Sequence, residues 1–299
     1  MAESTEALRL AAFAHLDRLK QLYPDGALPS AQINAFSYDG KPLRLIVQTG
    51  IWKPAGMAAA LSIRTTYTAP NEVPPYEDDL GSDGFVRYKY RGTDPDHSDN
   101  RALREAMRTG TPLIYFVGVD RGVYAANYPV WIEAEDRAQM EFAVSVDPAQ
   151  RALATEDMTW REREYAYRLT KQRLHQPIFR TRVLRAYADS CAMCRLKHVQ
   201  LLDAAHILRD GHPRGLPVVP NGLALCKIHH AAFDSNILGV RPDLVVEVRQ
   251  DVLEEIDGPM LRHGLQEMQG VRVQVPRIVQ ARPDQQGLEE RYEEFRAAG

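Results

Sequence analysis

Two pairs of potential metal ligands lie close together in the second half of the chain. Cys191 and Cys194 are separated by two residues, as are Cys226 and His229, and 31 residues lie between the pairs. Thiolate and imidazole groups are preferred ligands of Zn²⁺, and two such pairs can close a tetrahedron of the Cys₃His type. With no open position, the ion would be structural. The alternative is a buried cysteine pair beside a surface histidine.

A second set of polar residues follows the same segment. Adjacent helical residues differ by about 100° in direction, so His229 and His230 face different ways. His230 and Asp234 are spaced four residues apart and share one face of a helix. The pattern therefore predicts that His229 completes the zinc site, whereas His230 and Asp234 point into a second site.

The order His206, Asn221, His230, at spacings of 15 and 9 residues, resembles the motif of the HNH nucleases. The segment NGLALC and the flanking ligand pairs are similar to the zinc-supported subgroup of that family, and the resemblance covers about 45 residues. It implies a ββα-metal fold. In that fold His206 would end a strand, Asn221 would lie in the loop after the second strand, and His230 would lie on the helix.

The resemblance also implies roles in phosphodiester hydrolysis. His206 would take a proton from the attacking water, because a neutral imidazole titrates near physiological pH. Asn221 would hold the loop and orient His206. His230 would help to hold a divalent cation, Mg²⁺, Mn²⁺ or another, that stabilises the leaving oxygen. The alternative is a zinc-finger module that binds DNA without catalysis.

One position departs from the family pattern. Many members place an aspartate or histidine ligand directly before the catalytic histidine, where this chain has Ala205. Asp203 lies two residues earlier, so on a strand it would share the face of Ala205. Either Asp203 or Asp234 could therefore complete the catalytic metal site with His230.

Short motifs in the N-terminal half are similar to the SRA domain, a reader of modified cytosine. Their order is preserved over about 80 residues; they are Gly50-Ile51, Tyr76-Glu77-Asp78-Asp79, Gly84-Phe85, Tyr88, Gly92, Asn100-Arg101-Ala102-Leu103 and Gly122-Val123-Tyr124. The resemblance implies a PUA-type β-barrel that receives a base flipped out of the duplex. Tyr76 and Tyr88 would sandwich the base, and Asp79 would accept hydrogen bonds from its polar edge. Lys89 replaces a small hydroxyl residue of the family. The alternative is that these tyrosines are ordinary barrel aromatics beside a solvated acidic turn.

Periodicity places these motifs in an α+β chain with two domains, 1–150 and 151–299. Helices are expected at 1–23, 100–109 and 287–298, and a basic helical segment at 156–188 with a break near His175, caused by Pro177. Strands are expected at 43–47, 60–67, 84–90, 113–119, 123–132, 244–249 and 271–275.

Charge is unevenly distributed. The net charge is −3, yet residues 161–214 hold 12 Lys/Arg against 5 Asp/Glu, a balance of +7. A basic segment on an acidic body suits docking of a polyanion at one place, although a solvated basic helix is the plainer alternative. No apolar run is long enough to span a bilayer, and no secretory signal is visible at the start. A cytoplasmic location is therefore expected, with no membrane partner.

An SRA-like reader joined to an HNH nuclease resembles the modification-dependent (type IV) restriction endonucleases of bacteria. The expected substrate is double-stranded DNA with 5-methylcytosine or a related base. One active site cuts one strand, so a double-strand break predicts a homodimer or two separate encounters. Two other hypotheses stay open: an HNH nuclease without modification dependence, and a reader of modified DNA without catalysis.

Overall fold

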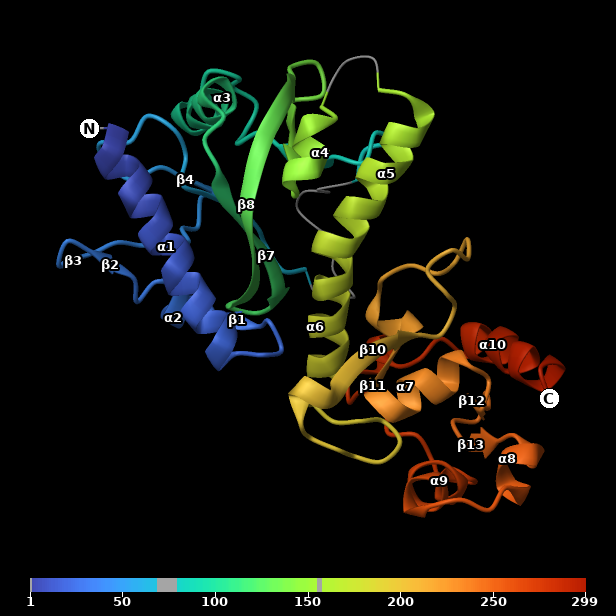
Figure 1. Cartoon of the computed structure of the whole chain (residues 1–299). Helices are drawn as coiled ribbons and strands as arrows, with labels where there is room; N and C mark the ends of the chain where they lie inside the picture. The colour runs from blue at the N-terminus through green and yellow to red at the C-terminus, as the bar shows by residue number, and fades with distance from the viewer. Residues whose placement is uncertain (1, 69–79, 155–157) are drawn as a thin grey trace. The chain divides into compact units, whose positions relative to one another are not determined.

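The structure, a computed structural model, describes residues 2–68, 80–154 and 158–299. It divides into two compact units, residues 1–178 and 179–299 (Figure 1). No helix in the described parts of the chain is both long and apolar enough to cross a membrane.

A curled sheet is the centre of the N-terminal unit. Within the described residues it has seven strands, with β8 (Val123–Asp136) the longest. The first half of β8 pairs with β7 (Figure 1), and the second half pairs with β9, so this strand joins the two parts of the sheet. Most pairs are antiparallel, but β5 and β7 are parallel. The strand path runs β4 (Ile51–Trp52), β5 (Ser62–Thr65), β7 (Leu113–Asp120), β8, β9 (Glu141–Ser145), β6 (Val86–Lys89), and β1 (Leu28–Pro29) pairs with β8 off this path.

The two faces of this sheet bury different helices. Successive side chains of a strand point to opposite faces. On β7, Leu113 and Tyr115 pack with α3 (Ser98–Thr109), whereas Ile114 and Phe116 pack with α1 (Ala2–Leu22). The predicted helices at 1–23 and 100–109 are therefore confirmed, and each covers one face.

The predicted β-barrel is not seen as a closed ladder. Among the described residues the strand path ends at β4 and β6, which do not pair with each other. A side chain bridges this opening instead: the Tyr88 hydroxyl on β6 donates a hydrogen bond to the Arg64 carbonyl on β5, at 3.2 Å. The unit is thus a curled, open sheet of mixed α+β type.

The predicted strand at 43–47 is wrong, and a side chain explains why. The Asn34 carboxamide accepts hydrogen bonds from the backbone N–H groups of Leu45 and Ile46, both at 2.9 Å, and donates to the Ile46 carbonyl. These bonds satisfy backbone groups that would otherwise need a neighbouring strand. Only the two-residue strands β2 (Ser37–Tyr38) and β3 (Lys41–Pro42) form in this region.

The basic helical segment differs from its prediction in two ways. No loop interrupts it near His175: α5 (Trp160–Thr170) continues through a π-helical turn, η1 (Lys171–His175), into α6 (Gln176–Ala186). The wider turn absorbs Pro177, which has no N–H to donate. The division between units also falls later than residue 150, because α5 packs on the N-terminal sheet.

Gly84 is the point where α5 meets that sheet. A Cβ at this residue would lie 2.3 Å from the Tyr167 backbone nitrogen, so only glycine allows the close approach. The Gly84 carbonyl accepts hydrogen bonds from the side chains of Gln150 and Thr170, at 2.7 and 2.6 Å. These contacts fix α5 to the N-terminal unit.

The C-terminal unit is built around a hairpin followed by a helix. Strands β10 (Leu202–His206) and β11 (Gly222–Cys226) are antiparallel, and α7 (Lys227–Asp234) follows directly. The core of this unit is made of apolar residues from the hairpin, α6 and a second hairpin. That second hairpin is β12 (Leu238–Val240) with β13 (Val246–Val248), and the helices α8 (Gln250–Glu254), α9 (Pro259–Gly264) and α10 (Gln285–Ala297) complete the unit. The strand expected at 271–275 is reduced to one bridge, between Val245 and Arg272.

Candidate active site

The four predicted zinc ligands come together. The ligand atoms of Cys191, Cys194, Cys226 and His229 all lie within 4.8 Å of one another. The Cys194 and Cys226 sulfurs are 4.0 Å apart, and His229 Nδ1 is 3.4 Å from Cys191 Sγ and 3.3 Å from Cys226 Sγ. A tetrahedral zinc ion with usual bond lengths separates its ligands by about 3.5–3.8 Å. The residues therefore fit a Cys₃His site.

Neighbouring backbone groups support this cluster. His229 Nε2 lies 2.9 Å from the Gly264 carbonyl, which leaves Nδ1 facing the sulfurs. Such a bond fixes the orientation of a metal-binding imidazole and makes it a better ligand. The Cys226 N–H donates to Cys191 Sγ, and hydrogen bonds with Cys194 and Cys226 lower the pKa of the Cys191 thiol. Zinc needs that thiolate form.

His230 points into a separate polar site. Its Nε2 lies 3.3 Å from Asp234 Oδ2, and its Nδ1 lies 3.8 Å from Asp203 Oδ2 on β10. Interaction first with Asp203 and then with Asp234 raises the pKa of His230 to about 9. Without a metal ion the imidazole is thus a cation between two carboxylates. A divalent cation bound there would replace that proton.

The two carboxylates differ in their surroundings. Asp203 also pairs with Lys227 at 3.3 Å and Arg180 at 3.5 Å, and interaction with His230, then Lys227, lowers its pKa to about 2. Asp234 is 57% exposed, compared with 32% for Asp203. Ala205 is fully buried, so the position before His206 offers no ligand.

His206 occupies the predicted place at the end of β10. Its ring stacks on Phe179 of α6, with 4.2 Å between ring centroids and 23° between planes. Opposite His206 in the hairpin lies Gly222. A Cβ there would come within 2.9 Å of the Phe179 ring and 2.5 Å of Val183, so a glycine is needed for α6 to pack this closely. Phe179 was not predicted from the sequence, although an aromatic on the preceding helix was a usable signal.

Asn221 corrects one part of the predicted geometry. It lies before the second strand, in the turn η3 (Val219–Asn221), and not in the loop after that strand. Its buried carboxamide accepts from the Leu208 N–H at 2.8 Å and donates to the carbonyls of Leu208 and Leu216, both at 3.0 Å. Its own carbonyl accepts from Ile207 N–H. Asn221 therefore holds the chain directly after His206.

The segment with this geometry, residues 191–241, matches the family described as HNH endonuclease. The C-terminal unit contains an HNH endonuclease domain. A solved structure titled "Modification dependent TagI restriction endonuclease" matches with 18% identity and a TM-score of 0.31, over 83% of this chain and 86% of that chain. A TM-score of this size does not establish a shared fold. No curated protein matches the chain in sequence.

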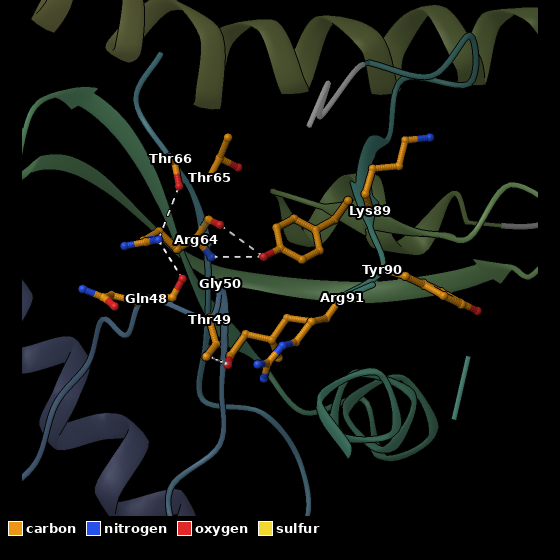
Figure 2. A pocket seen from close by; sticks show the side chains of 11 residues that line it. Gln48, Thr49, Gly50, Arg64, Thr65, Thr66, Lys89, Tyr90 and Arg91 are labelled. Atoms are coloured by element: carbon orange, nitrogen blue, oxygen red, sulfur yellow. Dashed lines mark hydrogen bonds between the residues drawn. The ribbon is translucent and has the colours of Figure 1, made fainter. Parts of the chain in front are cut away.

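Outside the HNH domain, a pocket of about 100 Å³ lies in the N-terminal unit, at the opening of the sheet, where it is lined by residues of β4, β5 and β6. Figure 2 shows residues from three segments around it, and Lys89 running away from Gly50 and Arg64. The pocket is lined by Gln48–Ile51, Arg64–Thr66 and Tyr88–Arg91. The start of the first segment and the whole middle segment were not predicted as part of a pocket, because no motif of the sequence includes them.

The predicted base-binding residues have different outcomes. Tyr88 is buried, lines the pocket, and meets Tyr115 edge-on at 6.1 Å. The Lys89 ammonium pairs with Glu141 on β9, so its charge is directed along the sheet and away from the base pocket predicted for it. Tyr76 and Asp79 lie outside the described residues.

Proposed function

We propose that this chain is a metal-dependent endonuclease that cuts DNA containing 5-methylcytosine or a related modified cytosine. The observation that supports the nuclease activity is that two adjacent histidines on α7 belong to two different sites. His229 belongs to the cysteine cluster, whereas His230 lies between two carboxylates. A zinc finger without catalysis gives the polar site of His230 and Asp234 no task, so the HNH nuclease is the better explanation.

In the proposed mechanism His206 is the general base. A neutral imidazole accepts the proton of the attacking water, and hydrogen-bond reach to that water is required. Stacking on Phe179 fixes the plane of the ring, and Asn221 fixes the backbone directly after it. Both the imidazole ring and the backbone of His206 are thus held in place before the substrate binds.

His230 and Asp234 would hold the catalytic cation, Mg²⁺, Mn²⁺ or another divalent ion. Such an ion supplies stabilisation of the charge that develops on the phosphate and the leaving oxygen. Asp234 is the more available of the two carboxylates, since Asp203 also pairs with Lys227 and Arg180. We assign Asp203 to orienting His230 through Nδ1.

The preference for modified DNA is assigned to the N-terminal pocket. Tyr88 presents an aromatic ring there, beside polar groups of Thr49 and Thr65. The SRA resemblance adds Tyr76 as the second ring and Asp79 as the acceptor for the amino group of cytosine. Extrusion of a base costs a few kcal/mol, which stacking and hydrogen bonding in such a pocket would offset.

A digestion assay tests both parts. One plasmid, methylated or unmethylated at cytosine, is incubated with the protein and Mg²⁺ or Mn²⁺. Cleavage of the methylated form alone supports the proposal. Equal cleavage of both forms leaves an HNH nuclease without modification dependence, and selective binding without cleavage leaves a reader.

Two variants locate the preference. Asp79→Ala removes the acceptor for the flipped base, and Tyr88→Ala removes a stacking partner; each should weaken binding of modified DNA by about 10- to 100-fold. Residual salt-sensitive binding should remain, since unmodified DNA is held through phosphates. Asp96→Ala, on a carboxylate that is 71% exposed, is the control. If Asp79→Ala discriminates methylated DNA as well as the parent does, the reader pocket is wrongly placed.

A further inference from the structure

Helix α5 carries an unusual set of exposed side chains. Among the described residues, the aromatic side chains of Phe, Trp and Tyr that are exposed to solvent all lie on this one helix. They are Trp160, Tyr165 and Tyr167, with exposed fractions of 74%, 45% and 41%. Large aromatic surfaces are normally buried, and several on one helix indicate a binding face.

Basic residues alternate with these aromatics. Arg161 and Arg168 are exposed on the same helix, as is Arg163. The two acidic residues of α5 offset two of these three positive charges, so the helix carries a net charge of +1. Glu162 lies in the capping box with Thr159, and Glu164 makes only a long, exposed pair with Arg168 at 3.5 Å.

The other face of α5 packs against the N-terminal unit, so the exposed face is not needed for that contact. Ala166 and Thr170 are fully buried, and Ala166 packs with Phe85 and Met158. Gly84 lies directly against the helix backbone. The exposed aromatics therefore remain in solvent after the N-terminal unit has formed its own contacts.

We propose that the α5 face, defined as Trp160, Arg161, Tyr165, Tyr167 and Arg168, binds the backbone of duplex DNA. Guanidinium groups, tyrosine hydroxyls and the indole N–H are all donors, and phosphate oxygens accept from each of these groups. Positive charge complements the polyanion. This inference rests on the proposed function, because it gives a second contact to the same DNA.

The salt dependence of DNA binding measures the contribution of the arginines of the α5 face. Removing one arginine that binds a phosphate lowers the slope of log K against log salt by about 0.9. The variant Arg161→Gln/Arg168→Gln should therefore lower the slope by about 2 and weaken binding about 30-fold at 0.15 M salt. The affinities for unmodified and methylated duplexes should fall equally, since phosphate contacts carry no base information.

A matched control separates the α5 face from a general decrease in charge. Arg108 on α3 is 70% exposed and pairs with Glu105, as Arg168 is 68% exposed and pairs with Glu164. Arg168→Gln should lower the salt slope, and Arg108→Gln should not. Equal effects of the two variants would overturn the proposal.

Fluorescence tests the aromatic part. Trp160 is far more exposed than Trp131, at 74% against 9%, and Trp52 is only partly exposed, so Trp160 should dominate quenching by neutral acrylamide. Bound duplex DNA should protect it, and the protection should vanish in Trp160→Phe. Unchanged quenching in a complex that demonstrably forms overturns the α5 proposal alone, whereas failure of any duplex to bind overturns the proposed function. Binding of anionic vesicles that disappears in the same variants, with DNA binding unaffected, would assign the face to a membrane instead.

Discussion

The HNH domain and the N-terminal pocket hold their functional residues in opposite ways. In the HNH domain the proposed metal ligands and catalytic residues lie within residues 191–234, on the turn that carries Cys191 and Cys194, the hairpin and the helix that follows it. The pocket collects segments near residues 50, 65 and 90, which meet only because the sheet curls. Metal ligands can therefore stabilise the first site locally, whereas the second depends on the packing of a whole unit.

The largest expected effect comes from removing zinc. Binding free energy of a structural zinc site is folding free energy, about 10–16 kcal/mol in zinc-finger peptides. Cys191→Ser, or a strong chelator, should unfold the HNH domain. The N-terminal unit should be unaffected, and the tryptophans report on it because all three, Trp52, Trp131 and Trp160, lie there.

Far-UV circular dichroism should thus lose signal while tryptophan emission stays constant. Elemental analysis should find about one zinc ion per chain. A metal-free protein with unchanged unfolding would contradict the closed Cys₃His site.

His206→Ala should come next. Loss of a general base typically costs about 10²–10⁴ in rate. The residue lies at the end of β10 and is only half-buried, so the variant should still fold and bind DNA. Single-turnover cleavage of a labelled duplex measures the rate. His198→Ala, outside the hairpin, is the control, and near-normal cleavage by His206→Ala would remove the assignment.

Acid should weaken the N-terminal unit in a defined window. Hydrogen bonds first from Arg104 and then from Tyr90 hold the pKa of Glu135 at about 2, below its usual 4.5. A depressed pKa stabilises the fold above pH 4.5, and this contribution is lost as pH falls towards 2. Glu135→Gln should cost about 2 kcal/mol at pH 7, from charged hydrogen bonds.

Urea unfolding followed by tryptophan emission tests this dependence. The difference between the parent and Glu135→Gln should shrink steadily between pH 4.5 and 2. A constant difference would show that the ion pair does not stabilise the unit. The HNH domain, which does not contain this pair, should unfold equally in both proteins.

The smallest effect is expected at Phe179. Leucine keeps most of the volume but removes the ring under His206, and an aromatic contact is worth about 0.5–1.5 kcal/mol. Phe179→Leu should therefore slow cleavage by about 2- to 10-fold with KM for DNA unchanged. Phe233→Leu, at another buried phenylalanine of the same core, is the control. Equal slowing in both variants would indicate a general packing effect.

The same contrast explains how far the sequence could predict the molecule. The zinc ligands and the separate directions of His229 and His230 were predictable, since they follow from local spacing on one turn and one helix. The position of Asn221 was not, because residue spacing does not show where the second strand begins or that Leu208 and Leu216 would be its hydrogen-bond partners. Phe179 was not predicted because it lies on α6, far from His206 along the chain.

In the N-terminal half the predicted helices are confirmed, whereas one strand is wrong, and the strands among the described residues do not close into a barrel. The alternation of apolar residues predicts which side chains of β7 lie on each face of the sheet. It does not show that the Asn34 side chain will bind the backbone of Leu45 and Ile46 in place of a neighbouring strand. Nor does it reveal which strand edges stay open. The dependence on DNA modification stays a prediction.

The Asn221 clamp has a consequence for how this domain can be altered. Its carboxamide forms hydrogen bonds with both Leu208 and Leu216, so the seven residues between them form a loop whose two ends are held close together. Lengthening a tied loop costs little, about 0.6 kcal/mol for each doubling. Insertions between Leu208 and Leu216 should therefore leave the pairing of His206 with Gly222 unchanged. This segment is a suitable place to insert a recognition loop without altering the proposed active site.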